Sequence, residues 1–279
     1  MGIPRSWRVA GVATLLALTL TACARAVAGV AEPGGTLCTA EDARPRTPST
    51  PTDAPVITVD DRVNWWIQNA HTAPLGLAVY GDGTVIRAEG DGSSAEPLPP
   101  MVIGRIDTCR VREAVDALFG LGGGDLGMPQ VTDLGTTTVT VTRQGSGKVI
   151  LSAYGLGVGD EYVSPEQAAA RATLTATIDA IVDAMSAEGA WAPNRLQLTR
   201  FERATSGPAL QWPLSGSISD VLERRTQGRL PCGVLDGVDA DAVTAALDGG
   251  PALALWDDGS DPATLAVGVL VPGQPACAG

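Results

Sequence analysis

The sequence predicts an α+β fold in which a mainly antiparallel sheet, built from β-hairpins, packs against three to four helices. Pairs of short alternating apolar segments are joined by glycine-containing turns, which is the signal of a β-hairpin. Segments with helical apolar spacing and capping residues lie between those pairs. Hairpins connected by helices are typical of the α+β class.

Residues 1–22 have the pattern of an export signal. Basic residues precede an uncharged apolar run over 9–22. A helix that spans a bilayer needs about 20 residues, and this run is shorter. It ends in the letters LTAC, with Cys23 last, and this ending resembles the lipobox of bacterial lipoproteins.

The lipobox resemblance implies that Cys23 is linked to diacylglycerol, becomes the first residue after cleavage and carries a further fatty acid such as palmitate. Several acyl chains anchor a protein stably, because each buried CH₂ contributes about 0.8 kcal/mol. We therefore expect an extracytoplasmic protein, anchored by lipid to the outer face of the cell membrane. The alternative is a soluble secreted protein with an incidental cysteine near its cleavage site.

The charge of the chain restricts its partners. The formal net charge is −12, and the signal contains no acidic residue, so the remainder is more acidic still. Such a surface repels nucleic acid and anionic lipid, so we expect no nucleic-acid partner and membrane binding through the lipid alone. Every basic residue except Lys148 is arginine, which favours a GC-rich source such as an actinobacterium.

An even number of cysteines in an exported chain indicates disulfides. Besides Cys23 the chain has four: Cys38, Cys109, Cys232 and Cys277. We favour the pairs Cys38–Cys109 and Cys232–Cys277, which keep each bridge within one half of the chain; the other pairings stay open. Metal-binding spacing is absent and His71 is the only histidine, so no metal or cofactor is predicted.

The chain after the signal is expected to have two parts. Residues 23–55 comprise the lipidated cysteine and a tether rich in proline and threonine, which favours extended polyproline II structure. Residues 56–279 form the α+β extracytoplasmic domain, either as one body or as two sub-halves of about 56–190 and 191–279.

The first half of this domain begins with a hairpin over 75–85, followed by a helix from an N-cap at Asp107 to a stop at Gly120 or Gly122. A second hairpin covers 136–155.

The clearest helix follows it, with Ser164 and Gln167 as a capping box and Gly189 as its end. Its predicted buried stripe is Leu174, Ile178, Ile181, Val182 and Met185. The second half is predicted to contain a strand over 195–202, helices near 218–226 and 239–250, and a final hairpin between about 252 and 271.

Three motifs suggest chemistry, but each has a structural interpretation that we favour. The G-x-G-x-x-G pattern over 122–127 follows a helix, whereas a dinucleotide site needs a strand before it. "GSGK" at 145–148 lacks the flanking residues of a phosphate loop and is typical of a hairpin turn. "WDDGSD" at 256–261 lacks the spacing of a calcium loop. The acidic residues at caps and turns have sufficient structural roles there: Asp82, Asp107, Asp239 and Asp258.

Tryptophan is concentrated in a chain that is only 4% aromatic. We favour core positions for most of these side chains. Trp65 and Trp66 are adjacent, and neighbours on a strand point in opposite directions, so this pair is the candidate for an exposed binding surface.

Beyond the lipobox, several segments resemble uncharacterised secreted proteins and lipoproteins of actinobacteria: "VYGDGTVI", "VTDLGTTTVTV", "WPL" at 212–214 and the closing "LVPGQPAC". The resemblance implies an extracytoplasmic location and this fold. That family has no assigned activity, so it implies no functional residues.

We expect a non-catalytic binding or interaction module at the cell envelope, with an envelope protein or a glycan as partner and no catalytic residue. One alternative is a carboxylate-dependent cell-wall hydrolase, and another is a structural envelope protein. A cleft with two carboxylates about 5–10 Å apart would favour the hydrolase. An exposed patch at Trp65 and Trp66 would favour binding.

Overall fold

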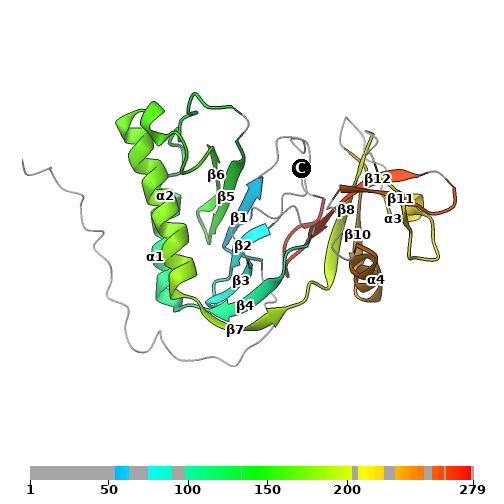
Figure 1. Cartoon of the computed structure of the whole chain (residues 1–279). Coiled ribbons are helices and arrows are strands. Elements are labelled where there is room, and N and C mark those ends of the chain that lie inside the picture. The colour runs from blue at the N-terminus through cyan, green and yellow to red at the C-terminus, as the bar shows by residue number, and fades with distance from the viewer. Residues whose placement is uncertain are drawn as a thin grey trace, which may run out of the picture. The chain divides into compact units, whose positions relative to one another are not determined.

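The computed structural model describes residues 54–62, 75–89, 98–132, 134–202, 207–222, 230–247, 253–260 and 262–277. All of them belong to one unit, Leu37–Gly279. Within these stretches the chain forms four α-helices and twelve strands in two sheets, whose strand pairs are antiparallel with one exception (Figure 1). This arrangement confirms the predicted α+β class with a mainly antiparallel sheet made of hairpins.

The first sheet has seven strands in the order β6-β5-β1-β2-β3-β4-β7, and every neighbouring pair is antiparallel. Its strands are β1 (Ile57–Arg62), β2 (Leu75–Val79), β3 (Thr84–Ala88), β4 (Met101–Arg105), β5 (Thr136–Arg143), β6 (Gly147–Tyr154) and β7 (Ser186–Trp191). The two hairpins predicted in this part of the chain are β2–β3 and β5–β6.

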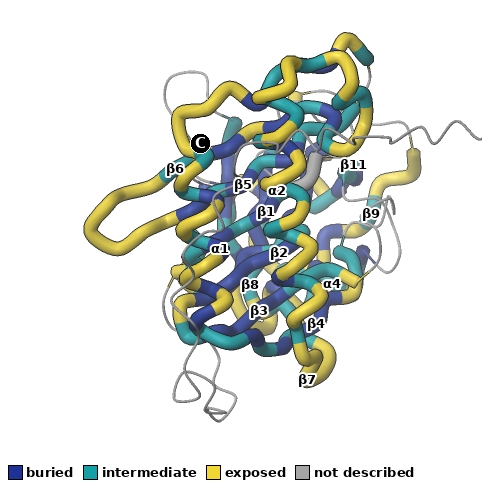
Figure 2. Tube along the Cα trace, turned by 90° about the vertical axis from the view of Figure 1, so that its left-hand side faces the viewer, coloured by how far each residue is buried: buried dark blue, intermediate teal, exposed yellow. Residues whose placement is uncertain are grey.

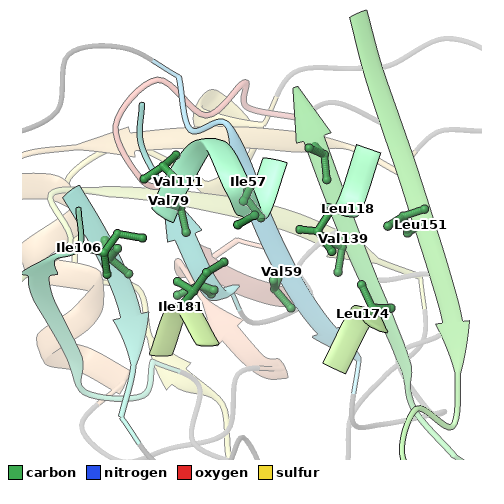
Figure 3. Close-up of a cluster of buried hydrophobic side chains, with 14 of the residues drawn as sticks. Ile57, Val59, Val79, Ile106, Val111, Leu118, Val139, Leu151, Leu174 and Ile181 are labelled. Atoms are coloured by element: carbon green, nitrogen blue, oxygen red, sulfur yellow. The ribbon is translucent and has the colours of Figure 1, made fainter. Parts of the chain in front are cut away.

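Helices α1 (Thr108–Gly120) and α2 (Pro165–Ala184) cover one face of this sheet (Figure 1). Figure 3 shows the core between them, where aliphatic side chains from the strands meet those of the helices. The residues labelled there are Ile57, Val59, Val79, Ile106, Val111, Leu118, Val139, Leu151, Leu174 and Ile181. Full burial of such a side chain contributes about 1.5–3 kcal/mol, so apolar burial is the main force that holds the helices on the sheet.

Capping residues determine where both helices begin, as the sequence predicts. The Asp107 carboxylate accepts a hydrogen bond from the Cys109 N–H at 2.8 Å. Ser164 and Gln167 form the capping box of α2. These contacts satisfy N–H groups that have no partner inside the first turn of a helix.

The second sheet has five strands in the order β10-β8-β12-β11-β9. Its strands are β8 (Arg195–Phe201), β9 (Leu210–Gln211), β10 (Cys232–Asp236), β11 (Leu253–Asp257) and β12 (Ala263–Val269). Helices α3 (Ile218–Val221) and α4 (Val238–Leu247) pack against it through a second apolar core. In this core Trp212 and Trp256 make an edge-to-face contact, with ring centroids 5.6 Å apart. The predicted final hairpin is β11–β12.

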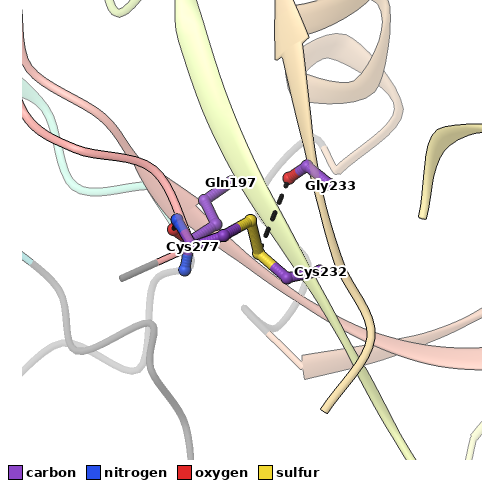
Figure 4. Close-up of a disulfide and its surroundings, with 4 residues drawn as sticks. All are labelled: Gln197, Cys232, Gly233 and Cys277. Carbon is purple, nitrogen blue, oxygen red and sulfur yellow. Dashed lines mark hydrogen bonds between the residues drawn. A yellow bond between two sulfur atoms is a disulfide. The ribbon is translucent and has the colours of Figure 1, made fainter. Parts of the chain in front are cut away.

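The predicted disulfide between Cys232 and Cys277 is present, with 5.9 Å between the two Cα atoms (Figure 4). It joins the start of β10 to the end of the described chain. The N–H of Cys277 also donates to Oε1 of Gln197, on the neighbouring strand β8, at 2.6 Å. Cys109 is disulfide-bonded as well; its predicted partner, Cys38, lies outside the described residues.

The segment that follows β12 also contacts the first sheet, on the face opposite α1 and α2. Val271 packs against Tyr80 and Ile86. The Tyr80 hydroxyl donates to the carbonyl oxygen of Pro272 at 3.0 Å. Burial, with a smaller contribution from the Asp82 carboxylate, raises the pKa of Tyr80 well above its usual range, so the phenol keeps the proton that this bond needs. The C-terminal segment therefore ties the second sheet to the first.

The turn between β2 and β3 requires the glycine at position 83. Gly83 has φ of +89°, in the left-handed region. A Cβ there would also clash with the carbonyl oxygen of Ile106. Because the backbones of Gly83 and Ile106 lie this close, the Ile106 N–H donates to the Gly83 carbonyl oxygen at 2.9 Å. This bond holds the start of α1 against the hairpin.

Two helix ends differ from the prediction. Helix α2 ends at Ala184 rather than Gly189, and residues 186–191 form β7, which the sequence did not predict. Nearly all residues of β7 are exposed, so its sequence lacks apolar alternation; the strand forms through backbone pairing with β4. Helix α3 ends at Val221, before the end of the helix predicted over 218–226.

Candidate functional site

The candidate binding pair Trp65 and Trp66 lies outside the described residues, as do Cys23, Cys38 and His71.

The tryptophans that the structure describes belong to the cores. Trp212 and Trp256 are buried, and Trp191 packs, half-buried, against the cluster around Val271. The Trp212 indole N–H donates to the Gly216 carbonyl oxygen at 2.9 Å. These three side chains therefore belong to the cores, as predicted for most of the tryptophans.

Two long loops meet at the end of the first sheet where β5 begins and β6 ends. Residues 121–135 connect α1 to β5, and residues 155–164 connect β6 to α2. The strand register places Arg62, Thr136 and Tyr154 in one row, so β1 also ends here.

Arg171, on α2, donates hydrogen bonds to both loops, and its side chain has no exposed surface. Its Nε–H donates to Oδ1 of Asp160 at 2.6 Å, and its Nη1 donates to the Leu126 carbonyl oxygen at 3.3 Å. Its Nη2 donates to the carbonyl oxygens of Tyr154 and Gly155 at 3.0 and 2.7 Å. Burying an arginine is favourable only when its donors are satisfied, and the planar guanidinium can satisfy several acceptors at once.

A second set of contacts ties the loop over 121–135 to the start of α2. Nε2 of Gln167 donates to Oδ2 of Asp125 at 2.8 Å, while Oε1 of Gln167 accepts the Ser164 N–H at 3.0 Å. Oδ1 of Asp125 accepts the Gly127 N–H at 2.8 Å. The same glutamine therefore completes the capping box and holds the loop.

Glycine at position 159 allows the two loops to pack closely. Gly159 has φ of +74°. A Cβ there would lie 3.1 Å from Cβ of Pro129 and 3.5 Å from Cδ2 of Tyr162. The Pro129 ring of one loop and the Tyr162 ring of the other thus both lie against this backbone.

Large apolar side chains are exposed on these packed loops. Met128 is 76% exposed, Val158 49% and Tyr162 60%. The N–H groups of Val158 and Tyr162 donate within the loop, to the carbonyl oxygens of Gly155 and Gly159, at 2.9 Å each. These hydrogen bonds hold the backbone at Val158 and Tyr162, and the Gly127 N–H bond to Asp125 holds the residue before Met128. We name these three side chains the loop-end patch. Exposed apolar side chains that gather in one place are typical of interaction sites.

The charges around the loop-end patch are negative. Residues 121–135 and 155–167 contain five acidic residues and no lysine or arginine: Asp125, Asp133, Asp160, Glu161 and Glu166. Asp160 is paired with Arg171. Hydrogen bonds from the Glu166 backbone and then from the Ser164 hydroxyl lower the pKa of Glu166, so this exposed carboxylate is ionised at neutral pH.

Other carboxylates predicted at caps and turns accept structural hydrogen bonds. Oδ1 of Asp82 accepts the Thr84 N–H at 2.9 Å, and Oδ2 of Asp258 accepts the Ile218 N–H at the start of α3 at 2.8 Å. No group of three or more potential metal ligands comes together in the part of the chain that the structure describes. Among the helices described, none has the length and apolarity needed to cross a membrane.

The role of Arg171 was not predicted from the sequence, although the sequence contains a signal for it. Leu174 and Ile181 are buried and Ile178 is partly buried on α2. Arg171 lies three residues before Leu174, so it extends this spacing of three and four residues towards the start of α2. It therefore lies on the buried face of the helix. An arginine in an apolar stripe predicts a buried guanidinium with several acceptors around it.

No protein-family model, curated protein or solved structure matches this chain.

Proposed function

We propose that this protein is a lipid-anchored, non-catalytic binding module of the cell envelope, and that its loop-end patch contacts a protein partner. The signal pattern over 1–22 and the lipobox-like ending at Cys23 support export and lipidation. The Cys232–Cys277 disulfide supports a location outside the cytoplasm, because such bonds persist in oxidising compartments. Residues 23–55 act as the spacer between the lipid and the folded part.

The observation that carries the binding proposal is that Met128, Val158 and Tyr162 are exposed on loops held by hydrogen bonds. Tyrosine and methionine are enriched at protein interfaces. A surface that is already ordered loses less conformational freedom on binding, so more of the contact energy appears as affinity. Arg171 and Gln167 supply this order through their hydrogen bonds to both loops.

The charge around the patch indicates the chemistry of the partner. The loops that carry the patch contain acidic residues and no basic residue. A protein surface with basic and apolar side chains is complementary to this arrangement, and opposite charges raise the rate of association. Added salt screens exposed charges, so this contribution decreases as ionic strength rises.

Combining Tyr162→Ala with Met128→Ala is expected to weaken partner binding about tenfold or more, since removal of a central interface side chain costs about 2 kcal/mol. The partner is first identified by cross-linking the anchored protein in intact cells, followed by mass spectrometry. Its affinity is then measured by surface plasmon resonance. Val238→Ala is the matched control, because Val238 is 80% exposed on α4, which packs on the second sheet, whereas the loops pack on the first. Equal affinities for the double variant and wild type would exclude the loop-end patch as the binding surface.

Lipidation predicts that Cys23→Ala moves the protein from the membrane fraction to the soluble extracytoplasmic fraction, because the acyl chains have no other attachment point. Fractionation and immunoblotting measure the distribution, with Cys23→Ser as a second variant that also lacks the thiol. A Cys23→Ala protein that still fractionates with the membrane would refute lipidation at this position, whatever the result for the patch.

A further inference from the structure

Strand β6 is the last strand at one edge of the seven-stranded sheet, and no described strand pairs with its outer side. It is eight residues long, from Gly147 to Tyr154, and its partner β5 pairs with it without a bulge. Figure 2 shows β6 at the margin of the molecule, next to exposed residues that lead into the β5–β6 turn.

The strand register shows which backbone groups face outward. The Gly155 N–H donates to the Gly135 carbonyl oxygen, which continues the ladder between β5 and β6. In an antiparallel ladder every second residue bonds to the neighbouring strand. Counting back from Gly155, the N–H and C=O groups of Ser152, Ile150 and Lys148 point away from β5, towards the open edge.

The opposite edge of the sheet has a bulge, which β6 lacks. The pairing of β7 with β4 shifts register between Ile103 and Gly104, and Glu188 lies in the bulge, with Oε1 3.3 Å from Nε of Arg105. Bulges and charged residues keep an edge from pairing with another chain. Lys148 is the only charged residue of β6, and the strand contains no proline.

An exposed apolar side chain lies in the middle of the open strand. Ile150 is 59% exposed, on the face of the sheet opposite the helices, and the exposed residues Lys148 and Ser152 flank it on the same face. The outward-facing order polar–apolar–polar, formed by Lys148, Ile150 and Ser152, is the same in both strand directions. A strand with such a pattern is complementary to itself when two copies run antiparallel.

We propose that two copies of this chain associate through β6, antiparallel about a two-fold axis at Ile150, which joins the two sheets into one. In this register the outward N–H and C=O of Ile150 bond to those of its counterpart, and the two exposed isoleucine side chains bury each other. Lys148 lies opposite Ser152 of the second copy, so like charges do not meet. A two-fold interface uses the same patch on both copies, as this pairing does.

The pairing uses Lys148, Ile150 and Ser152, none of which belongs to the loop-end patch. Strand β6 ends at Tyr154, at the loop end of the sheet. Because the paired strands are antiparallel, the two loop ends lie at opposite ends of the interface. The dimer therefore goes beyond the proposed function and does not depend on it.

Ile150→Lys is expected to abolish the association, since it places two like charges at the two-fold axis. Light scattering after size-exclusion chromatography compares the full chain, in detergent, as wild type, Ile150→Lys and Val238→Lys. Val238 is 80% exposed on α4, which packs on the second sheet, so this control has the same charge change outside the proposed interface. The wild type and the control are expected to have twice the mass of Ile150→Lys. Equal masses for all three would overturn the proposal.

Cysteine substitution tests the register even if the lysine variant misfolds. In a Cys23→Ala background, Ile150→Cys is expected to cross-link to its counterpart on mild oxidation, because the Cα atoms of such a pair are about 5.5 Å apart, within disulfide reach. Ser152→Cys is the matched control: its two copies are expected about 13 Å apart along the strands, too far to bond. A dimeric band for Ser152→Cys, or none for Ile150→Cys, would contradict pairing centred on Ile150.

Discussion

Arg171→Ala is expected to lower the free energy of unfolding by about 4 kcal/mol, because two backbone carbonyls lose their donor and each unsatisfied acceptor costs about 1–3 kcal/mol. These are the carbonyls of Leu126 and Tyr154; the carbonyl of Gly155 loses one donor but keeps the Val158 N–H. The ion pair with Asp160 contributes less, since that carboxylate is 37% exposed and water screens it. Chemical denaturation monitored by tryptophan fluorescence measures the change.

Two control variants separate this effect from general loss of an arginine. Arg110→Ala removes an arginine that is 62% exposed in an i, i+3 pair with Glu113, and it is expected to change stability by less than about 0.5 kcal/mol. Arg171→Lys keeps the charge but loses the planar set of donors, so we expect an intermediate loss. An Arg171→Ala protein as stable as Arg110→Ala would contradict the role assigned to this side chain.

Replacing Cys232 and Cys277 together by serine is expected to lower the free energy of unfolding by about 4 kcal/mol, because the bridge closes a loop with a sequence separation of 45 and restricts the unfolded chain. The same denaturation experiment measures it. Loss of the bridge is also expected to weaken a contact in the folded state, because the Cys277 N–H bond to Gln197 holds the C-terminal segment on β8.

A second measurement distinguishes the loss of this folded-state contact from the effect on the unfolded state. Hydrogen exchange of the segment after β12 is expected to increase in the double serine variant, while the core of the first sheet keeps its protection. Gln197→Ala leaves the bridge intact and is the matched control for the hydrogen bond alone. If the double variant kept wild-type stability and exchange, the bridge would not hold the C-terminal segment.

The parts of the fold that the sequence predicted are those with local signals. The β2–β3 and β5–β6 hairpins have glycine-containing turns between alternating segments, and α2 has a complete capping box. The pairing of Cys232 with Cys277 was one of several possibilities, and the structure confirms it. Local chemistry is sufficient for the hairpins and the helix cap, because these depend on neighbours within a few residues.

The parts that sequence reasoning missed depend on contacts distant in the chain. Strand β7 forms because β4 offers an edge, and almost all of its residues are exposed. The position of Arg171 follows the helical period, but its acceptors come from segments that the sequence does not bring together. The exposure of Met128 and Tyr162 likewise depends on how two loops pack at Gly159. The pair Trp65 and Trp66 stays a prediction.

The most direct test of the account is native-state hydrogen exchange of the two loops in wild-type protein. If the Arg171 contacts keep the loop-end patch ordered, the amides of Gly127, Val158 and Tyr162, which all donate hydrogen bonds, are protected, and Arg171→Ala removes this protection. Exchange of these amides at the rate of an unfolded peptide in the wild type would contradict a preformed binding surface.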